Sequence, residues 1–299
     1  MIMYTIIEND SFFEDIKSQE AKDNFDSLVD YLCSSLVPDR NIRSIDSRII
    51  VEEEILIDGN YEAEHLSFAN DFYSPQNLVL ANEVLKNRTA YKNIDSCDPF
   101  LIYGYSYIYE LDRDKVMELG TMKFYNSIAV MEHELIHILM ALNNNNPQPQ
   151  HAEVLSMFGE LLSLISFSKK NDNPYIYENA LVNRCISRMS YRVFSIEFSD
   201  EYIKDQSDFM NNSLHNAYPY MLGFIYANRL LNIYRDNKED VLYKVNNILS
   251  GKSTVKELLR DYGISLTDKN TCNDFISLCN QYRNIIEKKY SSSQLRSVR

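Results

Sequence analysis

The chain has 299 residues, enough for one large domain or two small ones. Because 45% of the residues are apolar and 24% are charged, the composition excludes a mainly disordered chain. The formal charge of −13, from 43 acidic and 30 basic residues, argues against nucleic-acid binding, since an acidic surface repels phosphate backbones. Only 7 glycines and 7 prolines favour long helices over a many-turned β fold.

The sequence has no pattern typical of secretion, membrane insertion or disulfide bonding. Met1–Asp15 has no basic stretch followed by an apolar block, so we expect no signal peptide. No apolar run approaches the roughly 20 residues that a membrane span needs, so we expect no membrane association. The 5 cysteines include no C-x-x-C pair, which favours free thiols in a reducing compartment. The sequence therefore predicts a cytoplasmic protein.

The first third of the chain mixes helical and strand patterns. Apolar spacing predicts a helix over Asp23–Leu36, a strand over Ile49–Ile57 and a short helix over Leu78–Lys86. In Leu101–Leu111 tyrosines alternate with other residues, which predicts a strand with four tyrosines on one face. That face either packs under helices or lines a cleft in which the strand pairs with an extended peptide.

From Phe124 onward the pattern is almost entirely helical. The predicted fold is therefore mainly α (α+β), with a small N-terminal mixed β-sheet region packed on a helical core. Residues 1–120 would form the α+β part that lines the cleft, 121–290 the helical core and 291–299 a flexible tail. Helices are predicted near 125–142, 152–169, 177–193, 198–210, 214–235, 239–250, 254–261 and 271–289.

The most informative motif is H-E-x-x-H at His133–His137, inside the amphipathic stretch Ser127–Leu142. On a helix His133 and His137 share one face and can point at a single ion. Glu134, rotated by about 100° from His133, can reach a water on that ion without ligating it. This arrangement is typical of zinc hydrolases, in which zinc acidifies water and a carboxylate takes its proton. The alternative is a pair of histidines hydrogen-bonded in a helical core.

A catalytic zinc needs a third protein ligand, and the extended H-E-x-x-H-x-x-G-x-x-H pattern is absent because Met140 and Asn143 stand at its later positions. Ala152–Phe167 is instead a mostly apolar helix that carries Glu153 and Glu160 seven residues apart, on one face. Buried carboxylates are costly unless they are paired or bound to metal.

The sequence thus predicts Glu153 as the third zinc ligand and Glu160 as the residue that orients a ligating histidine. Three alternatives stay open. Glu153 could be an acid favoured by the helix N-terminus, Glu160 could be solvated, or His151 could ligate in place of Glu153.

Three segments resemble the oligoendopeptidase F / thimet oligopeptidase family of zinc peptidases. They are His133–His137, the Glu-led helix Ala152–Glu160, and Ala217–Ala227 with its Tyr-x-Tyr-x-x-Gly pattern. Leu249–Ile264 is similar to the closing segment of these enzymes, so the resemblance covers roughly residues 120 to 290. It implies a gluzincin-type catalytic core that binds one Zn²⁺.

The resemblance also implies an oxyanion-binding tyrosine, which Tyr220 matches best. Tyr218, and His215 as a weaker match, precede it and would assist. The alternatives are core packing for both tyrosines and a surface position for the histidine, and His65 has only a structural interpretation. The chain departs from the family at Ile136, where Gly is usual, and a β-branched residue there would narrow the space near the metal.

These patterns predict a zinc metallopeptidase in which Glu134 is the general base and a peptide or protein segment is the substrate. The part before the predicted catalytic core is short for the resembled family, which implies an open substrate cleft. Two rivals remain, a regulatory peptidase dedicated to one protein substrate and an inert zinc-containing peptide-binding module. The sequence leaves the oligomeric state open.

Overall fold

A computed structural model describes residues 14–36, 61–86, 89–91, 104–111, 114–122, 127–143, 147–174, 177, 178, 181, 185 and 207–296. The helical elements begin with η1 (Glu14–Ile16), α1 (Gln19–Leu36), α3 (Tyr61–Phe72) and α4 (Pro75–Lys86). The later helices are α5 (Ser127–Leu142), α6 (Pro149–Lys170), α8 (Ser207–Asp236), α9 (Lys238–Leu249), α10 (Val255–Asp261) and α11 (Lys269–Arg296).

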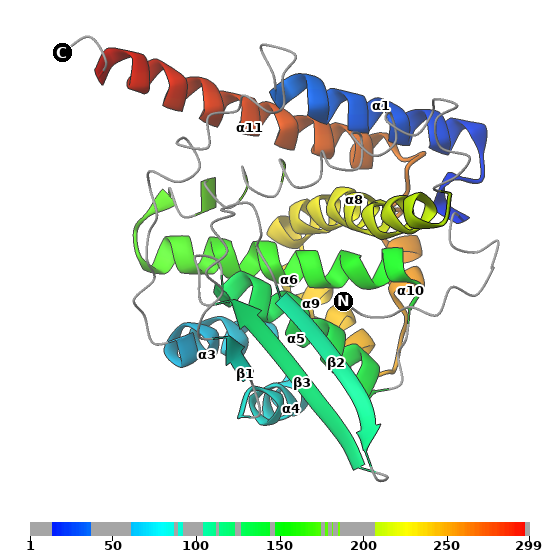
Figure 1. The fold of residues 1–299 in the computed structure, drawn as a ribbon, viewed down its shortest axis with the longest axis vertical. Helices are drawn as coiled ribbons and strands as arrows, with labels where there is room; N and C mark the ends of the chain where they lie inside the picture. The colour runs from blue at the N-terminus through cyan, green and yellow to red at the C-terminus, as the bar shows by residue number, and fades with distance from the viewer. Residues whose placement is uncertain are drawn as a thin grey trace.

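Helix α6 forms the centre of the molecule, between α5 and α8 (Figure 1). Its residues from His151 to Leu164 are all buried, because apolar side chains lie on most sides of the helix. Two polar side chains in this stretch, Glu153 and Glu160, are only 4% and 3% exposed. The fold therefore places carboxylates in its interior, where each needs a partner.

Helices α1 and α11 lie side by side and run in the same direction along the outer side of α8 (Figure 1). Tyr31 of α1 donates to the Asn280 side chain at 2.8 Å, and Arg283 of α11 donates to Ser35 Oγ at 3.3 Å. The N-terminal helix thus packs on the C-terminal helix, so the two ends of the described chain stabilise one body.

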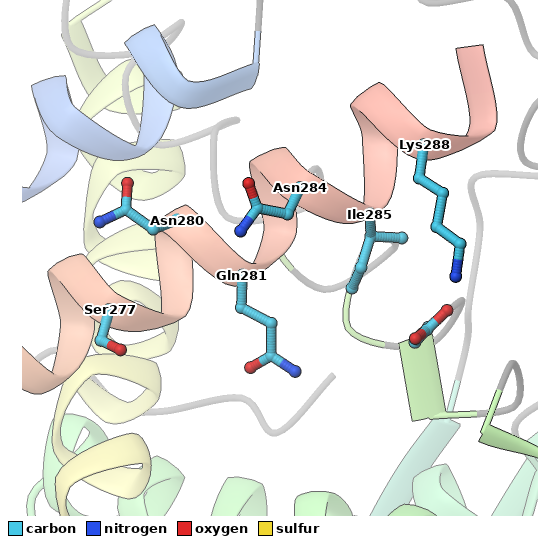
Figure 2. Close-up of a pocket in the computed structure, with 7 residues that line it drawn as sticks. Ser277, Asn280, Gln281, Asn284, Ile285 and Lys288 are labelled. Carbon is cyan, nitrogen blue, oxygen red and sulfur yellow. The ribbon is translucent and has the colours of Figure 1, made fainter. Parts of the chain in front are cut away.

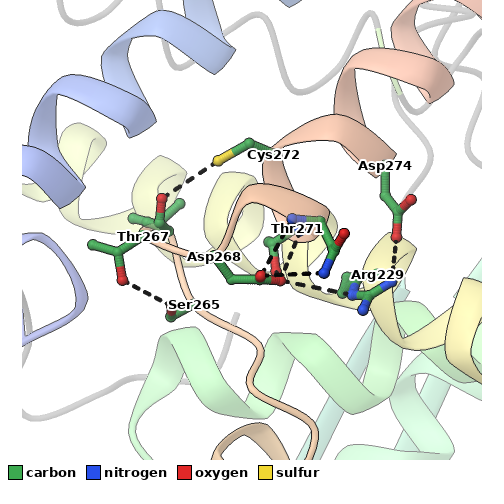
Figure 3. A network of polar contacts seen from close by, with 9 residues as sticks. Arg229, Ser265, Thr267, Asp268, Thr271, Cys272 and Asp274 are labelled. Carbon is green, nitrogen blue, oxygen red and sulfur yellow. Dashed lines mark hydrogen bonds and ion pairs between the residues drawn. The ribbon is translucent and has the colours of Figure 1, made fainter.

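A polar network joins α8 to the start of α11 (Figure 3). Arg229 of α8 donates to Asp274 at 2.9 Å and lies 3.9 Å from Asp268. Asp268 precedes α11 and accepts hydrogen bonds of 2.9 Å from both the backbone N–H and the hydroxyl of Thr271, as helix-capping residues do. The network fixes the C-terminal half of α8, the helix that also borders α6.

The predicted α+β class is wrong, and the fold is mainly α. Residues described with their side chains are 85% helical, and none of them lies in a strand or sheet. Three strands, β1 (Thr89–Tyr91), β2 (Gly104–Leu111) and β3 (Asp114–Met122), pair in the order β1-β3-β2, and β2 matches the predicted strand Leu101–Leu111 (Figure 1). The physical reason is that the described N-terminal residues fold as α1, α3 and α4, whose apolar faces complete a helical core. A mixed-sheet layer is not part of that described core.

Most predicted helices are present with boundaries shifted by a few residues. The predicted break between 198–210 and 214–235 is absent, because α8 runs from Ser207 through Pro219 to Asp236, and residues 198–206 lie outside the described residues. The predicted strand Ile49–Ile57 and most of the predicted helix 177–193 lie outside the described residues. Helix α11 continues to Arg296, into the predicted tail. Within the described part of the chain, no helix is long and apolar enough to cross a membrane.

Candidate metal centre

Helix α5 carries His133 and His137, and helix α6 brings Glu153 next to them. The two Nε2 atoms lie 3.2 Å apart, and Glu153 Oε2 is 3.2 Å from Nε2 of His133. Glu153 Oε1 is 3.6 Å from Nε2 of His137. All three side chains are buried, and one ligand atom from each lies within 4.8 Å of the others. The described residues therefore form a group that can hold a metal ion.

The outward-facing ring nitrogens of both histidines also find partners on α6. Nδ1 of His133 lies 3.1 Å from Glu160 Oε2, and Nδ1 of His137 lies 3.2 Å from the hydroxyl of Ser156. Positions 153, 156 and 160 share one helical face, so α6 supplies a candidate ligand and both outer partners. Glu160 lies beside a histidine, as predicted, whereas Ser156 was missed because its role depends on the position of the His137 ring.

The donor set suits a divalent cation. Two imidazole nitrogens and one carboxylate are the protein ligands of many catalytic zinc sites, which keep a fourth position for water. The carboxylate of Glu160 and the hydroxyl of Ser156 lie at the Nδ1 atoms, as outer partners of metal-bound histidines do. Without a cation, a proton would have to lie between the buried ring nitrogens and carboxylate oxygens that face one another at 3.2 to 3.6 Å.

The carboxylates around His133 favour its protonated form. Burial lowers the pKa of this imidazole, but the hydrogen bond and charge of Glu153, assisted by Glu160 and Glu134, raise the pKa to about 10. The pKa of His137 is lowered, mainly by burial. In the metal-free cluster His133 therefore takes up a proton. This positive charge balances the carboxylates of Glu153 and Glu160, as a bound cation would.

His151 is not part of the cluster. Its Nε2 lies 3.3 Å from the carboxylate of Asp15, which also accepts a 3.0 Å hydrogen bond from Tyr226. Burial raises the pKa of Asp15, but the hydrogen bond and charge of His151, together with the Tyr226 hydroxyl, lower it overall. This pairing favours Glu153 over His151 as the third ligand.

The predicted oxyanion residues separate into two environments. The Tyr220 ring stacks on His133 with centroids 6.5 Å apart and is 39% exposed, so it borders the cluster from α8. Tyr218 is 1% exposed and makes an edge contact with Phe25 of α1, which fits core packing. His215 lies in the backbone trace of α8, and its side chain, like that of His65, lies outside the described residues.

Glu134 is half-buried, whereas both neighbouring histidines are buried. Its charge raises the pKa of His133 and opposes the lowering of the pKa of His137. The preceding residue, Glu132, is fully buried on another face and accepts a 2.8 Å hydrogen bond from Tyr73. The motif thus carries one carboxylate toward the cluster and another into the core.

Close packing of α6 explains the departure at Ile136. A Cβ built on Gly159 would overlap the Ile136 side chain, so Ile136 fills the space that Gly159 leaves on α6. Ile136 is 0% exposed and belongs to the core, where the end of its side chain lies against α6. The small residue that allows α5 and α6 to approach lies on α6 in this chain.

Gly223 allows α8 to approach α6 closely at Glu153, the candidate third metal ligand. A Cβ on this residue would lie 2.6 Å from Glu153 Cβ and 3.0 Å from its carbonyl carbon. We expect Gly223→Ala to displace Glu153 and to destabilise the protein by about 1–3 kcal/mol, the usual cost of overpacking. Urea unfolding and zinc titration measure the two effects.

Gly159→Ala is the control for overpacking, because its new Cβ would overlap the end of the Ile136 side chain and would contact none of the three candidate ligands. We expect it to retain zinc affinity. Equal zinc affinity of the Gly223→Ala variant and the wild type would contradict a close approach at Glu153.

No family model, curated protein or solved structure matches this chain. The interpretation of the centre therefore rests on its own geometry and on the motif resemblance.

A separate open cavity of about 430 Å³ lies along α11 (Figure 2). Asn280, Gln281, Asn284 and Lys288 line it from that helix. None of its lining residues belongs to the His133 cluster, so the cavity and the candidate metal centre are distinct.

Proposed function

We propose that the protein is a zinc-dependent metallopeptidase that hydrolyses peptide bonds in peptides or in an exposed protein segment. The observation that carries the proposal is the buried convergence of His133, His137 and Glu153 on one point, next to Glu134. A structural metal site has no need of a carboxylate beside the ligands, whereas hydrolysis does. The motif resemblance to oligoendopeptidases supports the same activity.

Zn²⁺ bound here would acidify a water molecule and polarise the carbonyl of the scissile bond. His133, His137 and Glu153 would hold the ion, and Glu160 would orient His133 through Nδ1. Glu134 would accept the proton of the attacking water and pass it to the leaving amine. Its half-buried position fits this task, because the base must meet both water and substrate.

Tyr220 is proposed to donate a hydrogen bond to the developing oxyanion. It stacks on His133 and keeps a 39% exposed side chain, so its hydroxyl can meet a substrate. His215 and Tyr218 remain weaker proposals as assisting residues, since Tyr218 contacts the core. We also propose a cytoplasmic location, since the described cysteines are free thiols.

We expect Tyr220→Phe to lower kcat about 100-fold or more, as the loss of an oxyanion donor does, and to leave zinc binding unchanged. Tyr243→Phe is the matched control, because this tyrosine is also exposed, at 68%, and lies on α9. Steady-state kinetics on a fluorogenic peptide measure the difference. Equal kcat values for the two variants would remove Tyr220 from the mechanism.

A cleavage assay tests the proposed function. The zinc-loaded protein is incubated with a diverse peptide mixture, and the products are identified by mass spectrometry, with and without a chelator. Many chelator-sensitive cuts would support a general peptidase. Cleavage of a single protein from a proteome, with no peptide cleaved, would favour a dedicated regulatory peptidase. No cleavage of peptides or proteins, with zinc bound, would favour an inert binding module.

A further inference from the structure

Ser156 of α6 is buried between the backbone of its own helix and the ring of His137. It is 0% exposed, and its hydroxyl contacts two groups, the carbonyl of Ala152 at 3.1 Å and Nδ1 of His137 at 3.2 Å. A serine hydroxyl has a single proton, so it can donate to only one of these two groups. A carbonyl oxygen can only accept, so Ser156 donates at the 3.1 Å contact with Ala152, and a hydroxyl that donates there accepts from Nδ1 of His137.

This hydrogen-bond order fixes the tautomer of the imidazole. If Ser156 accepts, Nδ1 of His137 carries the proton, and the lone pair lies on Nε2. That nitrogen faces Nε2 of His133 and Oε1 of Glu153, at 3.2 and 3.6 Å. A neutral imidazole binds a metal through its lone pair, so the tautomer set by Ser156 is the one that the centre needs.

The two histidines are therefore held by chemically different partners. His133 has a buried carboxylate, Glu160, at Nδ1, whereas His137 has a neutral hydroxyl. A carboxylate increases the basicity of its histidine more than a hydroxyl does, because a negative charge stabilises the positive imidazole. His137 thus depends on the direction of its hydrogen bond, which the Ala152 carbonyl sets, rather than on an added charge.

We propose that Ser156 is a positioning residue that holds His137 in the metal-binding tautomer and orientation. The inference rests on the proposed metal centre, and it assigns to α6 a third functional side chain beside Glu153 and Glu160. Ser156 acts through His137 and touches neither the water nor the substrate.

The test compares Ser156→Ala with Ser163→Ala. Both serines are fully buried on α6, and Ser163 donates to the carbonyl of Glu160 at 2.8 Å, so each variant loses one hydroxyl bonded to the helix backbone. We expect Ser156→Ala to weaken Zn²⁺ binding about 10- to 100-fold, measured by competition with a chromophoric chelator. Ser163→Ala should bind Zn²⁺ within a few-fold of the wild type.

Two further readouts separate positioning from general stability. Ser156→Thr keeps the hydroxyl and should restore most of the affinity. In ¹⁵N spectra of the histidine rings, Nδ1 of His137 should be protonated in the wild type and Ser163→Ala, and should lose that fixed state in Ser156→Ala.

Wild-type affinity in Ser156→Ala, with zinc bound normally by the wild type, would overturn this inference and leave the proposed function intact. Failure of the wild type to bind zinc would overturn both.

Discussion

Glu134→Gln is expected to retain the metal and to lower kcat for peptide cleavage by about 100- to 10,000-fold, the usual contribution of a general base. Glutamine keeps the size of the side chain but cannot accept the proton of the attacking water. Because Glu134 is no member of the ligand cluster, the zinc content should stay at the wild-type value. Single-turnover kinetics together with elemental analysis measure both quantities on one preparation.

Glu239→Gln controls for the change in net charge, since Glu239 is exposed in the first turn of α9. It should cleave at the wild-type rate. Cleavage by Glu134→Gln at the same rate would show that another group acts as base, and loss of its zinc would place Glu134 among the ligands.

Removal of the metal is expected to lower the melting temperature, by an amount that grows with pH. An ion at a thousand times its Kd stabilises the fold by about 4 kcal/mol, or roughly 10 °C for a chain of this size. In the metal-free protein the pKa of His133 is raised to about 10 by Glu153 and Glu160, which outweigh the opposing effect of burial.

The sign of the pH effect follows from that raised pKa. The proton on His133 contributes stability that is fully present below the unfolded pKa of about 6.5 and is lost as the pH rises through about 10. The metal-loaded protein does not depend on this proton. Calorimetry with and without chelator should therefore show a difference in melting temperature that widens from pH 6.5 to 10. A constant or shrinking difference would contradict the proposed balance of charge.

Much of the centre could be predicted from the sequence because it depends on helical spacing. The four-residue spacing of His133 and His137 and the seven-residue spacing of Glu153 and Glu160 each specify one face of a helix. Because Glu153 and Glu160 lie on a mostly apolar helix, each needed a buried partner. In the structure, His133 contacts both carboxylates. These expectations needed no knowledge of how the helices cross.

Features that depend on long-range contacts could not be predicted. The pairing of His151 with Asp15 joins residues 136 positions apart in the sequence, and the fit of Ile136 against Gly159 depends on how α5 crosses α6. Ser156 is an unremarkable residue until the position of the His137 ring is known. The α+β prediction was wrong because the described core is built from helices, although the tyrosine-rich segment does form the predicted strand, as β2.

Equilibrium dialysis against Zn²⁺, followed by elemental analysis, tests the central claim most directly. The wild type should retain about one ion per chain, and Glu153→Gln, which preserves side-chain size but removes the charged ligand, should retain almost none at the same free zinc. Circular dichroism confirms that the variant keeps its helices. Zinc binding that is absent from the wild type, or equal in the folded variant, would contradict a metal centre at His133, His137 and Glu153.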